Sequence, residues 1–257
     1  MPPFSDSSLK KLAFSLCTKL RKVEFEKNSQ LLEIKGGSFG YCLIEKFIIP
    51  SKVKIIHKHS FFSCFCLKTI EFEPNSELET ICDEAFAFSG CENISFPPNF
   101  RNFEQGAFCK APNIANVFIP KENKHFLYWK KQILLYKSDS KSDVFDEIVF
   151  GPQNMIKCII PSFAKKISGF AFYKSNMTKI SFMNNSELQF IGISSFSEAS
   201  LESITIPQSV VYIEERAFSC CFSLKSVIFS KSSQLKKIGK FAFSQTSIEE
   251  IFIPSSV

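Results

Sequence analysis

Three histidines and ten cysteines are the side chains of this sequence best suited to bind a metal ion or to act as a catalytic base or nucleophile. His57 and His59 flank Lys58 and could supply two metal ligands, but the sequence offers no third ligand beside them. His125 has no nucleophile near it in the sequence. We therefore interpret the histidine pair as part of a solvated turn and expect neither a metal site nor a cofactor.

The cysteines lack the spacing that zinc sites usually have. Cys64 and Cys66 are separated by one residue, and Cys220 and Cys221 are adjacent, so neither pair forms a Cys-x-x-Cys motif. A lone pair of glycines at 36–37 is likewise insufficient for a phosphate-binding loop. Because no convergent set of catalytic groups is present, the sequence predicts a protein that is not an enzyme.

The composition excludes several classes of protein. With 45% hydrophobic and 22% charged residues in 257, the chain is too apolar to be disordered. Its formal net charge of +6 is too small to indicate a nucleic-acid partner, and none is expected. The first residues, MPPFSDSSLKKLAF, lack the apolar core of a signal peptide. No stretch approaches the roughly 18 apolar residues of a membrane span, so membrane insertion is not expected.

The large number of phenylalanines, 31 in all, has a structural cause, because many of them recur at a fixed place in a repeat. A small residue followed by Phe occurs at intervals of 22 to 25 residues, apart from one interval of 64. A large apolar residue stands five positions before each Phe, and a small residue, often Cys, stands three positions after it. These phenylalanines are Phe14, Phe39, Phe61, Phe86, Phe108, Phe172, Phe196, Phe218 and Phe243.

A second pattern, apolar-x-x-apolar-x-apolar, begins five or six residues after the Phe, as in LESITI at 201–206. Its last four positions alternate between apolar and exposed residues, which predicts one short, half-buried strand in each repeat. The strand then runs either into Ile-Pro and Ser-Val or into an Asn/Ser-Ser-x-Leu turn. Since a unit of this length cannot bury a core alone, successive copies must stack into a solenoid.

The combined string I-x-x-x-A-F-x-x-C-x-x-L-x-x-I-x-I-P-x-S-V, seen at 213–229 and 201–210, resembles the BspA-like subclass of leucine-rich repeats. The resemblance covers nearly the whole chain. It implies a single, β-rich repeat solenoid at 1–257, with about ten repeats of 22–25 residues. Each repeat would have one short parallel strand, with turns or short helical segments on the other side.

The same resemblance implies a function in binding rather than in catalysis, since many members of that family are surface antigens and adhesins. The implied partner is a protein or a host or matrix ligand, and the implied location is the cell surface or outside the cell. Two alternatives stay open: a structural spacer or self-assembling fragment of a longer repeat array, and the recognition arm of a larger enzyme.

The longest interval between repeat phenylalanines contains an irregular segment at about 121–145. Two aromatic-aliphatic runs, FLYW and ILLY, are separated by Lys130, Lys131 and Gln132, which predicts a hairpin that protrudes from the coil. The hairpin would either cover its own gap in the core or contact a partner through Tyr128 and Trp129, because exposed Tyr and Trp are typical interface anchors.

Strand positions that point away from the core are the natural contact surface of a solenoid. One such column alternates in charge, as at Arg21, Glu45 and Lys68, so its side chains are expected to pair between neighbouring strands. A second column holds large apolar residues where polar ones would suffice, and it is the candidate partner-binding surface. Its apolar members are Ile48, Phe118, Ile228 and Phe252.

The last residues, IPSSV, are followed by no capping repeat. A solenoid that ends on an open coil has an unpaired strand edge and an exposed apolar end. The sequence therefore predicts that the chain is incomplete at its C-terminus, or that it associates end to end with another copy.

Overall fold

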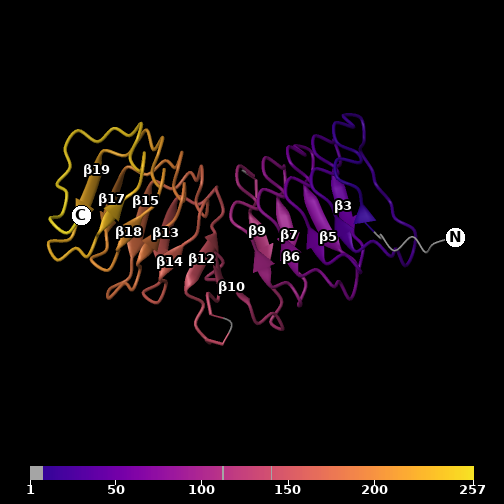
Figure 1. Ribbon diagram of the computed structural model, residues 1–257, viewed down its shortest axis with the longest axis horizontal. Coiled ribbons are helices and arrows are strands. Elements are labelled where there is room, and N and C mark those ends of the chain that lie inside the picture. Colours follow the sequence, from indigo (N-terminus) through magenta and orange to yellow (C-terminus); the bar gives the residue numbers. More distant parts are fainter. Residues whose placement is uncertain (1–7, 112, 140) are drawn as a thin grey trace. The chain divides into compact units, whose positions relative to one another are not determined.

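The computed structural model describes residues 8–111, 113–139 and 141–257. The chain divides into two compact units, Met1–His125 and Phe126–Val257, and each is a stack of coils with parallel strands (Figure 1). Turns rather than helices complete each coil in the described residues. The expected β-rich repeat solenoid is confirmed, whereas a single domain that is incomplete at its C-terminus stays a prediction.

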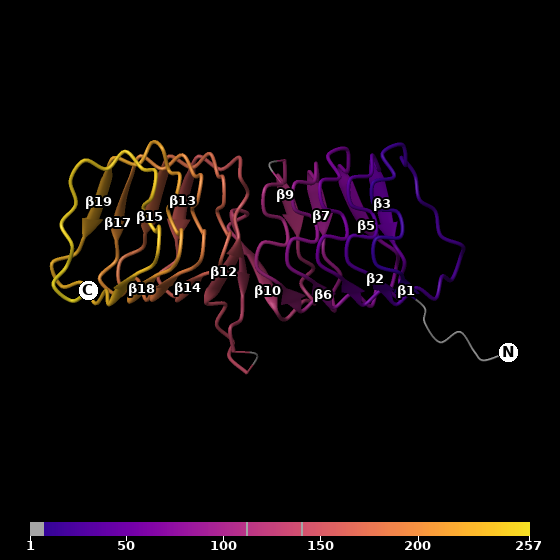
Figure 2. The ribbon, with the colours of Figure 1, turned by 45° about the horizontal axis from the view of Figure 1, so that its top comes forward.

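The first unit contains two parallel sheets, which Figure 2 shows as two rows of strands. The long strands form a four-stranded sheet of β3 (Lys46–Ile49), β5 (Thr69–Phe72), β7 (Asn93–Ser95) and β9 (Asn116–Phe118). The short strands form a five-stranded sheet of β1 (Ser8–Leu9), β2 (Glu33–Ile34), β4 (Ile55–Ile56), β6 (Thr80–Ile81) and β8 (Asn102–Phe103).

The second unit repeats this arrangement. Its long strands are β13 (Lys157–Ile160), β15 (Lys179–Phe182), β17 (Ser203–Ile206) and β19 (Ser226–Phe229). Its other sheet has seven strands: β10 (Phe126–Trp129), β11 (Ile133–Tyr136), β12 (Glu147–Phe150), β14 (Lys166–Ile167), β16 (Phe190–Ile191), β18 (Tyr212–Ile213) and β20 (Lys237–Ile238). These long strands are ones that the alternating pattern predicts, although the same pattern at 20–25 and 248–253 forms no strand. The short strands add a second ladder to each coil, built on the large apolar residue five positions before the Phe.

The repeat phenylalanines form one aromatic stack in each unit. Adjacent rings are nearly parallel, and their centroids lie 4.9 to 5.4 Å apart from Phe14 to Phe108. From Phe172 to Phe243 the same separation is 5.1 to 5.2 Å. The inner rings of both stacks, such as Phe61 and Phe196, have no exposed surface. Each stack therefore forms a continuous apolar column that no single coil could provide.

The backbone around each repeat Phe has an unusual conformation. Residues two positions before and two positions after the Phe all have positive φ, between 51° and 73°, although only Gly37 and Gly106 among them are glycine. This conformation turns alternate N–H groups towards the next coil: the N–H of Phe39 donates to the Ser60 carbonyl at 2.8 Å, and that of Tyr41 to the Phe62 carbonyl at 2.8 Å. A further ladder of hydrogen bonds therefore joins the coils beside the two sheets.

The cysteines three positions after the Phe also form hydrogen bonds between coils. The Sγ atoms of Cys42, Cys64 and Cys221 each donate to the carbonyl of the repeat Phe in the preceding coil, at 3.0 to 3.2 Å. All ten cysteines are free thiols. Burial raises the pKa of the Cys64 thiol to about 12, so the group stays protonated and serves as a hydrogen-bond donor.

Candidate ligand-binding face

The outward-facing side chains of the four-stranded sheet form one column across the first unit. Ile48 is in register with Glu71 on the next strand, and Ser95 is in register with Phe118. Ile48 is 44% exposed and Phe118 61% exposed, whereas the alternate residues, such as Phe47, point into the core and are buried. The first and fourth strands thus present apolar side chains, and the two strands between them present polar ones.

The second unit has the same order of side chains on its four-stranded sheet. Ile159 is in register with Ser181, and Thr205 is in register with Ile228. Ile159 is 49% exposed and Ile228 55% exposed. Ile228 was predicted in this column from the sequence, whereas Ile159 was not. The signal was present, since MIKCII at 155–160 has the same apolar-x-x-apolar-x-apolar pattern as the other strands. We call each of these columns with its sheet an open face.

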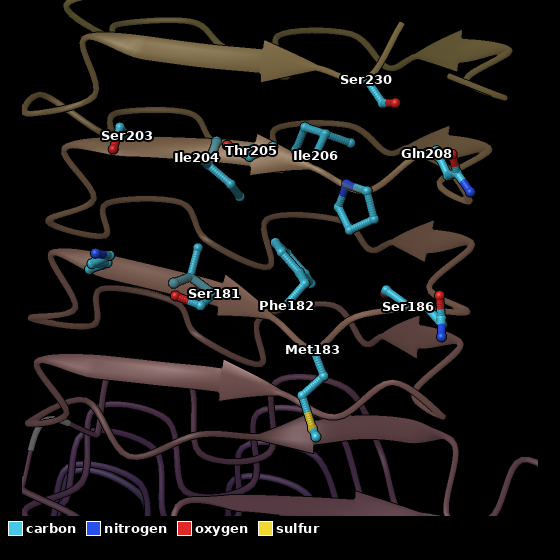
Figure 3. Close-up of a pocket in the computed structure, with 14 residues that line it drawn as sticks. Ser181, Phe182, Met183, Ser186, Ser203, Ile204, Thr205, Ile206, Gln208 and Ser230 are labelled. Atoms are coloured by element: carbon cyan, nitrogen blue, oxygen red, sulfur yellow. The ribbon is translucent and has the colours of Figure 1, made fainter. Parts of the chain in front are cut away.

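A groove of about 510 Å³ crosses the middle of the second open face, between β15 and β17 (Figure 3). These two strands pair only at Lys179 and Ser203, whereas the flanking strand pairs are in register at four positions each. The lining combines polar side chains, including Lys179, Ser181, Ser203 and Thr205, with the apolar side chains of Phe182 and Met183.

The first open face has a groove in the equivalent place. It measures about 630 Å³ and lies between β5 and β7, which pair only at two positions. Its lining is richer in proline and acidic residues, with Glu71 and Glu73 beside Phe72, Phe118 and several prolines. Two grooves in matching positions indicate that the repeat itself creates them.

The cause is the alternation of the two turn types that follow the long strand. In coils with the Asn-Ser turn, the residue after the strand donates its N–H to the preceding coil: Glu73 to the Ile49 carbonyl and Met183 to the Ile160 carbonyl, both at 3.0 Å. The residues at the same place in the next coils are prolines at 97 and 207, which have no N–H. The ladder is therefore interrupted at this level, and the strands separate.

The two grooves differ in electrostatic character. In the first, the Oε1 atom of Glu71 lies 2.7 Å from the Nζ atom of Lys46. A carboxylate oxygen of Glu73 accepts a hydrogen bond from the backbone N–H of Ser51 at 2.8 Å. In the second, Lys179 is the charged residue of the lining, which contains no carboxylate. The hydroxyls of Ser203 and Thr205 have no hydrogen-bond partner within the part of the chain that the structure describes, so they are available to a ligand.

The predicted hairpin exists, but its strands do not protrude. β10 and β11 pair antiparallel, and β11 also pairs with β12, so both strands belong to the seven-stranded sheet. Trp129 packs against the core of the second unit, and burial raises the pKa of Tyr128. The reason is the apolar run of ILLY, whose residues Ile133 to Leu135 are fully buried. Residues 137–139 and 141–146, between β11 and β12, are the part that extends away from the coils (Figure 2).

His57 and His59, which the sequence offered as metal ligands, take part in contacts between coils. The Nε2 atom of His57 lies 2.9 Å from a carboxylate oxygen of Glu33, and His59 pairs with Glu84, so each histidine joins two coils. The described residues contain no cluster of three side chains able to hold a metal ion. Phe252 is 79% exposed and lies outside any strand.

Stacked coils with parallel strands, a buried aromatic column and an open strand face define a β-solenoid of the leucine-rich repeat class. The sequence profile described as "BspA type Leucine rich repeat region" matches the chain in six copies, over residues 3–115 and 144–257. The chain therefore belongs to the BspA-type leucine-rich repeat family.

Several solved structures have a similar fold. The pneumococcal vaccine antigen PcpA is 22% identical with a TM-score of 0.73, and the alignment covers 93% of this chain and 68% of that one. A leucine-rich cell surface protein from Faecalibacterium prausnitzii is 17% identical with a TM-score of 0.62, covering 95% and 75%. A leucine-rich repeat protein from Bacteroides ovatus is 21% identical with a TM-score of 0.57, covering 96% and 70%.

No curated protein matches the chain. Within the described residues, no helix has the length and hydrophobicity needed to cross a membrane.

Proposed function

We propose that this protein is a non-enzymatic, adhesion-type module that binds a protein partner through its two open faces. The observation that carries the proposal is the exposure of large apolar side chains on strands whose other outward residues are polar. Ile48, Phe118, Ile159 and Ile228 are each 44% to 61% exposed. Full burial of such a side chain contributes about 1.5–3 kcal/mol, so a partner that covers even part of one face gains affinity.

The rigidity of the sheet supports this proposal. Each apolar side chain is held by a strand whose inward neighbours are buried, so little conformational entropy is lost when a partner binds. Related structures include a vaccine antigen and a cell surface protein, which agrees with a location at the cell surface or outside the cell. A host or matrix protein is the partner class that fits such a location.

Self-association is a second candidate, and the exposure of Phe252 and Ile253, at 79% and 51%, is the observation that favours it. A concentration series in analytical ultracentrifugation tests it directly: association that Phe252→Ser abolishes supports this candidate, and a monomer at every concentration contradicts it. Contact through Tyr128 and Trp129 stays a prediction, and the packing of Trp129 against the core favours a structural role for the hairpin.

The open-face proposal is tested by binding of the full chain to an array of purified extracellular matrix and host-surface proteins. The variants are Ile48→Ser with Phe118→Ser for the first face and Ile159→Ser with Ile228→Ser for the second. Ile193→Ser is the matched control, because Ile193 is 46% exposed but lies in a turn and not on an open face. The proposal predicts that a face variant loses a binding partner that the control retains. It is wrong if every interaction survives in both face variants, or if the control loses the same partners.

A further inference from the structure

We propose that each open face binds an extended peptide segment of the partner, which crosses the strands and places apolar side chains at positions i and i+4. This inference rests on the proposed function and gives the partner's contacting segment a chemical pattern.

The two apolar side chains of a face stand on its first and fourth strands. Paired strands lie about 4.8 Å apart, so three intervals separate Ile159 from Ile228, and Ile48 from Phe118, by about 14 Å, to which the groove adds some width in the middle interval. An extended peptide advances about 3.3–3.4 Å per residue, which places its residues i and i+4 about 13–14 Å apart. Residues i+2 and i+6 would lie about 7 Å and about 20 Å away, so i+4 is the same-side spacing nearest to the separation on the face.

The direction of the side chains selects the same spacing. Side chains of an extended peptide alternate between its two sides, so i, i+2 and i+4 all point to the same side. A peptide with apolar residues at i and i+3 would place them about 10 Å apart and on opposite sides, and could contact only one of the two. The open face therefore selects i and i+4 over neighbouring spacings.

The groove receives the residue between the two apolar positions. The side chain at i+2 lies above the second and third strands, where the interrupted ladder leaves about 510 Å³ in the second unit and about 630 Å³ in the first. In the second unit, the hydroxyls of Ser203 and Thr205 are available to hydrogen-bond the peptide. Such bonds replace those that the peptide backbone loses when water leaves.

The charges at the grooves give the two faces different preferences for the residue at i+2. Glu71 and Glu73 line the first groove, and Lys46 offsets only part of their charge, so Lys or Arg is favoured there. Lys179 is the charged residue of the second lining, so Ser, Thr, Asp or Glu is favoured there. The two faces thus bind two versions of one peptide pattern.

The probes for the test are nine-residue peptides, acetylated and amidated, with Leu at the third and seventh positions. The fifth position is Lys in one peptide and Glu in the other, and the remaining positions are Ser and Thr. A control peptide has Leu at the third and sixth positions. Binding to the full chain is measured by fluorescence anisotropy with a label on each peptide, up to about 1 mM protein, which detects even weak peptide complexes.

The expected result is a crossed pattern. Phe118→Ser should weaken binding of the Lys peptide by about tenfold and Ile228→Ser that of the Glu peptide by a similar factor, because each variant removes one apolar contact. Ile193→Ser should change neither. Thr205→Lys adds a positive charge at an exposed position of the second groove. It should weaken the residual binding of the Lys peptide to the second face, because like charges repel. Thermal unfolding checks that this variant keeps its fold.

The inference is overturned if neither peptide binds, if the i, i+3 peptide binds equally well, or if the control variant weakens binding as much as the face variants. These outcomes leave the proposed function intact when the face variants still lose a folded partner on the protein array. If the face variants lose no partner on the array, the proposed function itself fails.

Discussion

Adjacent coils of the first unit are joined by ion pairs, whereas most coils of the second unit are joined without them. In the first unit, side chains 22 to 25 residues apart pair along the chain, as Arg21 does with Glu45 at 3.4 Å and Lys58 with Asp83 at 2.8 Å. In the described part of the second unit, ion pairs between coils occur only at its start, where Lys165 and Lys166 pair with Asp146 and Glu147, each 19 residues earlier. Further along, neutral contacts such as Cys220 to Gln245 take their place.

The comparison of the two units separates the contacts that define the coil from those that only adjust its stability. The aromatic stack, the two strand ladders and the hydrogen bonds around the Phe are present in both units, so they fix the coil. The ion pairs lie at the surface and are found mainly in one unit. Exposed pairs of this kind are worth about 0–1 kcal/mol each, so they adjust stability without determining the fold.

The largest expected effect comes from breaking the aromatic stack at its centre. Phe61→Ala and Phe196→Ala should each lower the free energy of unfolding by about 3–5 kcal/mol, because each leaves a cavity between two stacked rings. Denaturant unfolding measures the loss, and Phe222→Ala, at a 67% exposed position, is the control. Markedly unequal losses for Phe61→Ala and Phe196→Ala would show that the two aromatic stacks contribute unequally to the free energy of unfolding.

A smaller effect is expected at the start of the second aromatic stack, where a glycine packs directly against the first ring. Gly151 lies in the coil before Phe172, and a Cβ added there would be 2.3 Å from the Cε1 atom of that buried ring. Gly151→Ala should therefore destabilise the second unit by about 1–3 kcal/mol, since the ring has no room to move. Gly40→Ala in the first unit is the matched control, because its nearest atoms are 3.6 Å or further away. Equal thermal stability of the two variants would contradict this packing.

The ion pairs should give the first unit a distinct response to acid. Hydrogen bonds from Lys35 and His57 hold the pKa of Glu33 below its usual value of 4.5. A lowered pKa contributes stability above the unfolded value, and that stability is lost as the pH falls through the folded pKa. Hydrogen exchange by mass spectrometry should therefore show earlier loss of protection around Glu33 below about pH 4.5 than in the second unit.

The variant Glu33→Gln separates this effect from general acid unfolding. It should remove the difference at acid pH and cost at most about 1 kcal/mol at neutral pH, because the pair is partly exposed. The interpretation fails if the acid response of the first unit is unchanged in Glu33→Gln.

The smallest expected effect concerns the positive-φ positions. The first unit has glycine at two of them, Gly37 and Gly106, and the second unit has none. Lys174 is exposed with a φ of 56°, so Lys174→Gly should raise the free energy of unfolding by about 0.4–1 kcal/mol by relieving backbone strain. Gly106→Ala is the reciprocal change and should lower it by a similar amount. A stabilising Gly106→Ala would contradict the strain argument.

The repeated coil could be predicted from the sequence, because the same buried positions take the same residue types in many copies. The Phe column, the small residue three positions after it and the alternating long strand could each be recognised, since a buried position tolerates few residue types. The apolar members of the open face, such as Ile48 and Ile228, were found in the same way. Ile159 follows the irregular segment, but MIKCII at 155–160 has the same pattern as the other strands, so its place on the face could also be predicted from the sequence.

Other features depended on contacts between coils and could not be derived from one copy. Positive φ at residues such as Tyr41 and His59 has no signature in their residue types, since the next coil's carbonyls select that conformation. The hairpin strands join a sheet because a buried β12 is available to pair with β11. The grooves arise because the proline that follows the strand in one coil has no N–H to donate to the preceding coil.

The repeat, its aromatic column and the family of the chain could be recognised from the amino acids alone, because these features follow from which residue types can be buried. The places where the ladders break, and the exposed side chains that share a face, became known from the folded chain, because both depend on the hydrogen-bond partners and register that one coil offers the next.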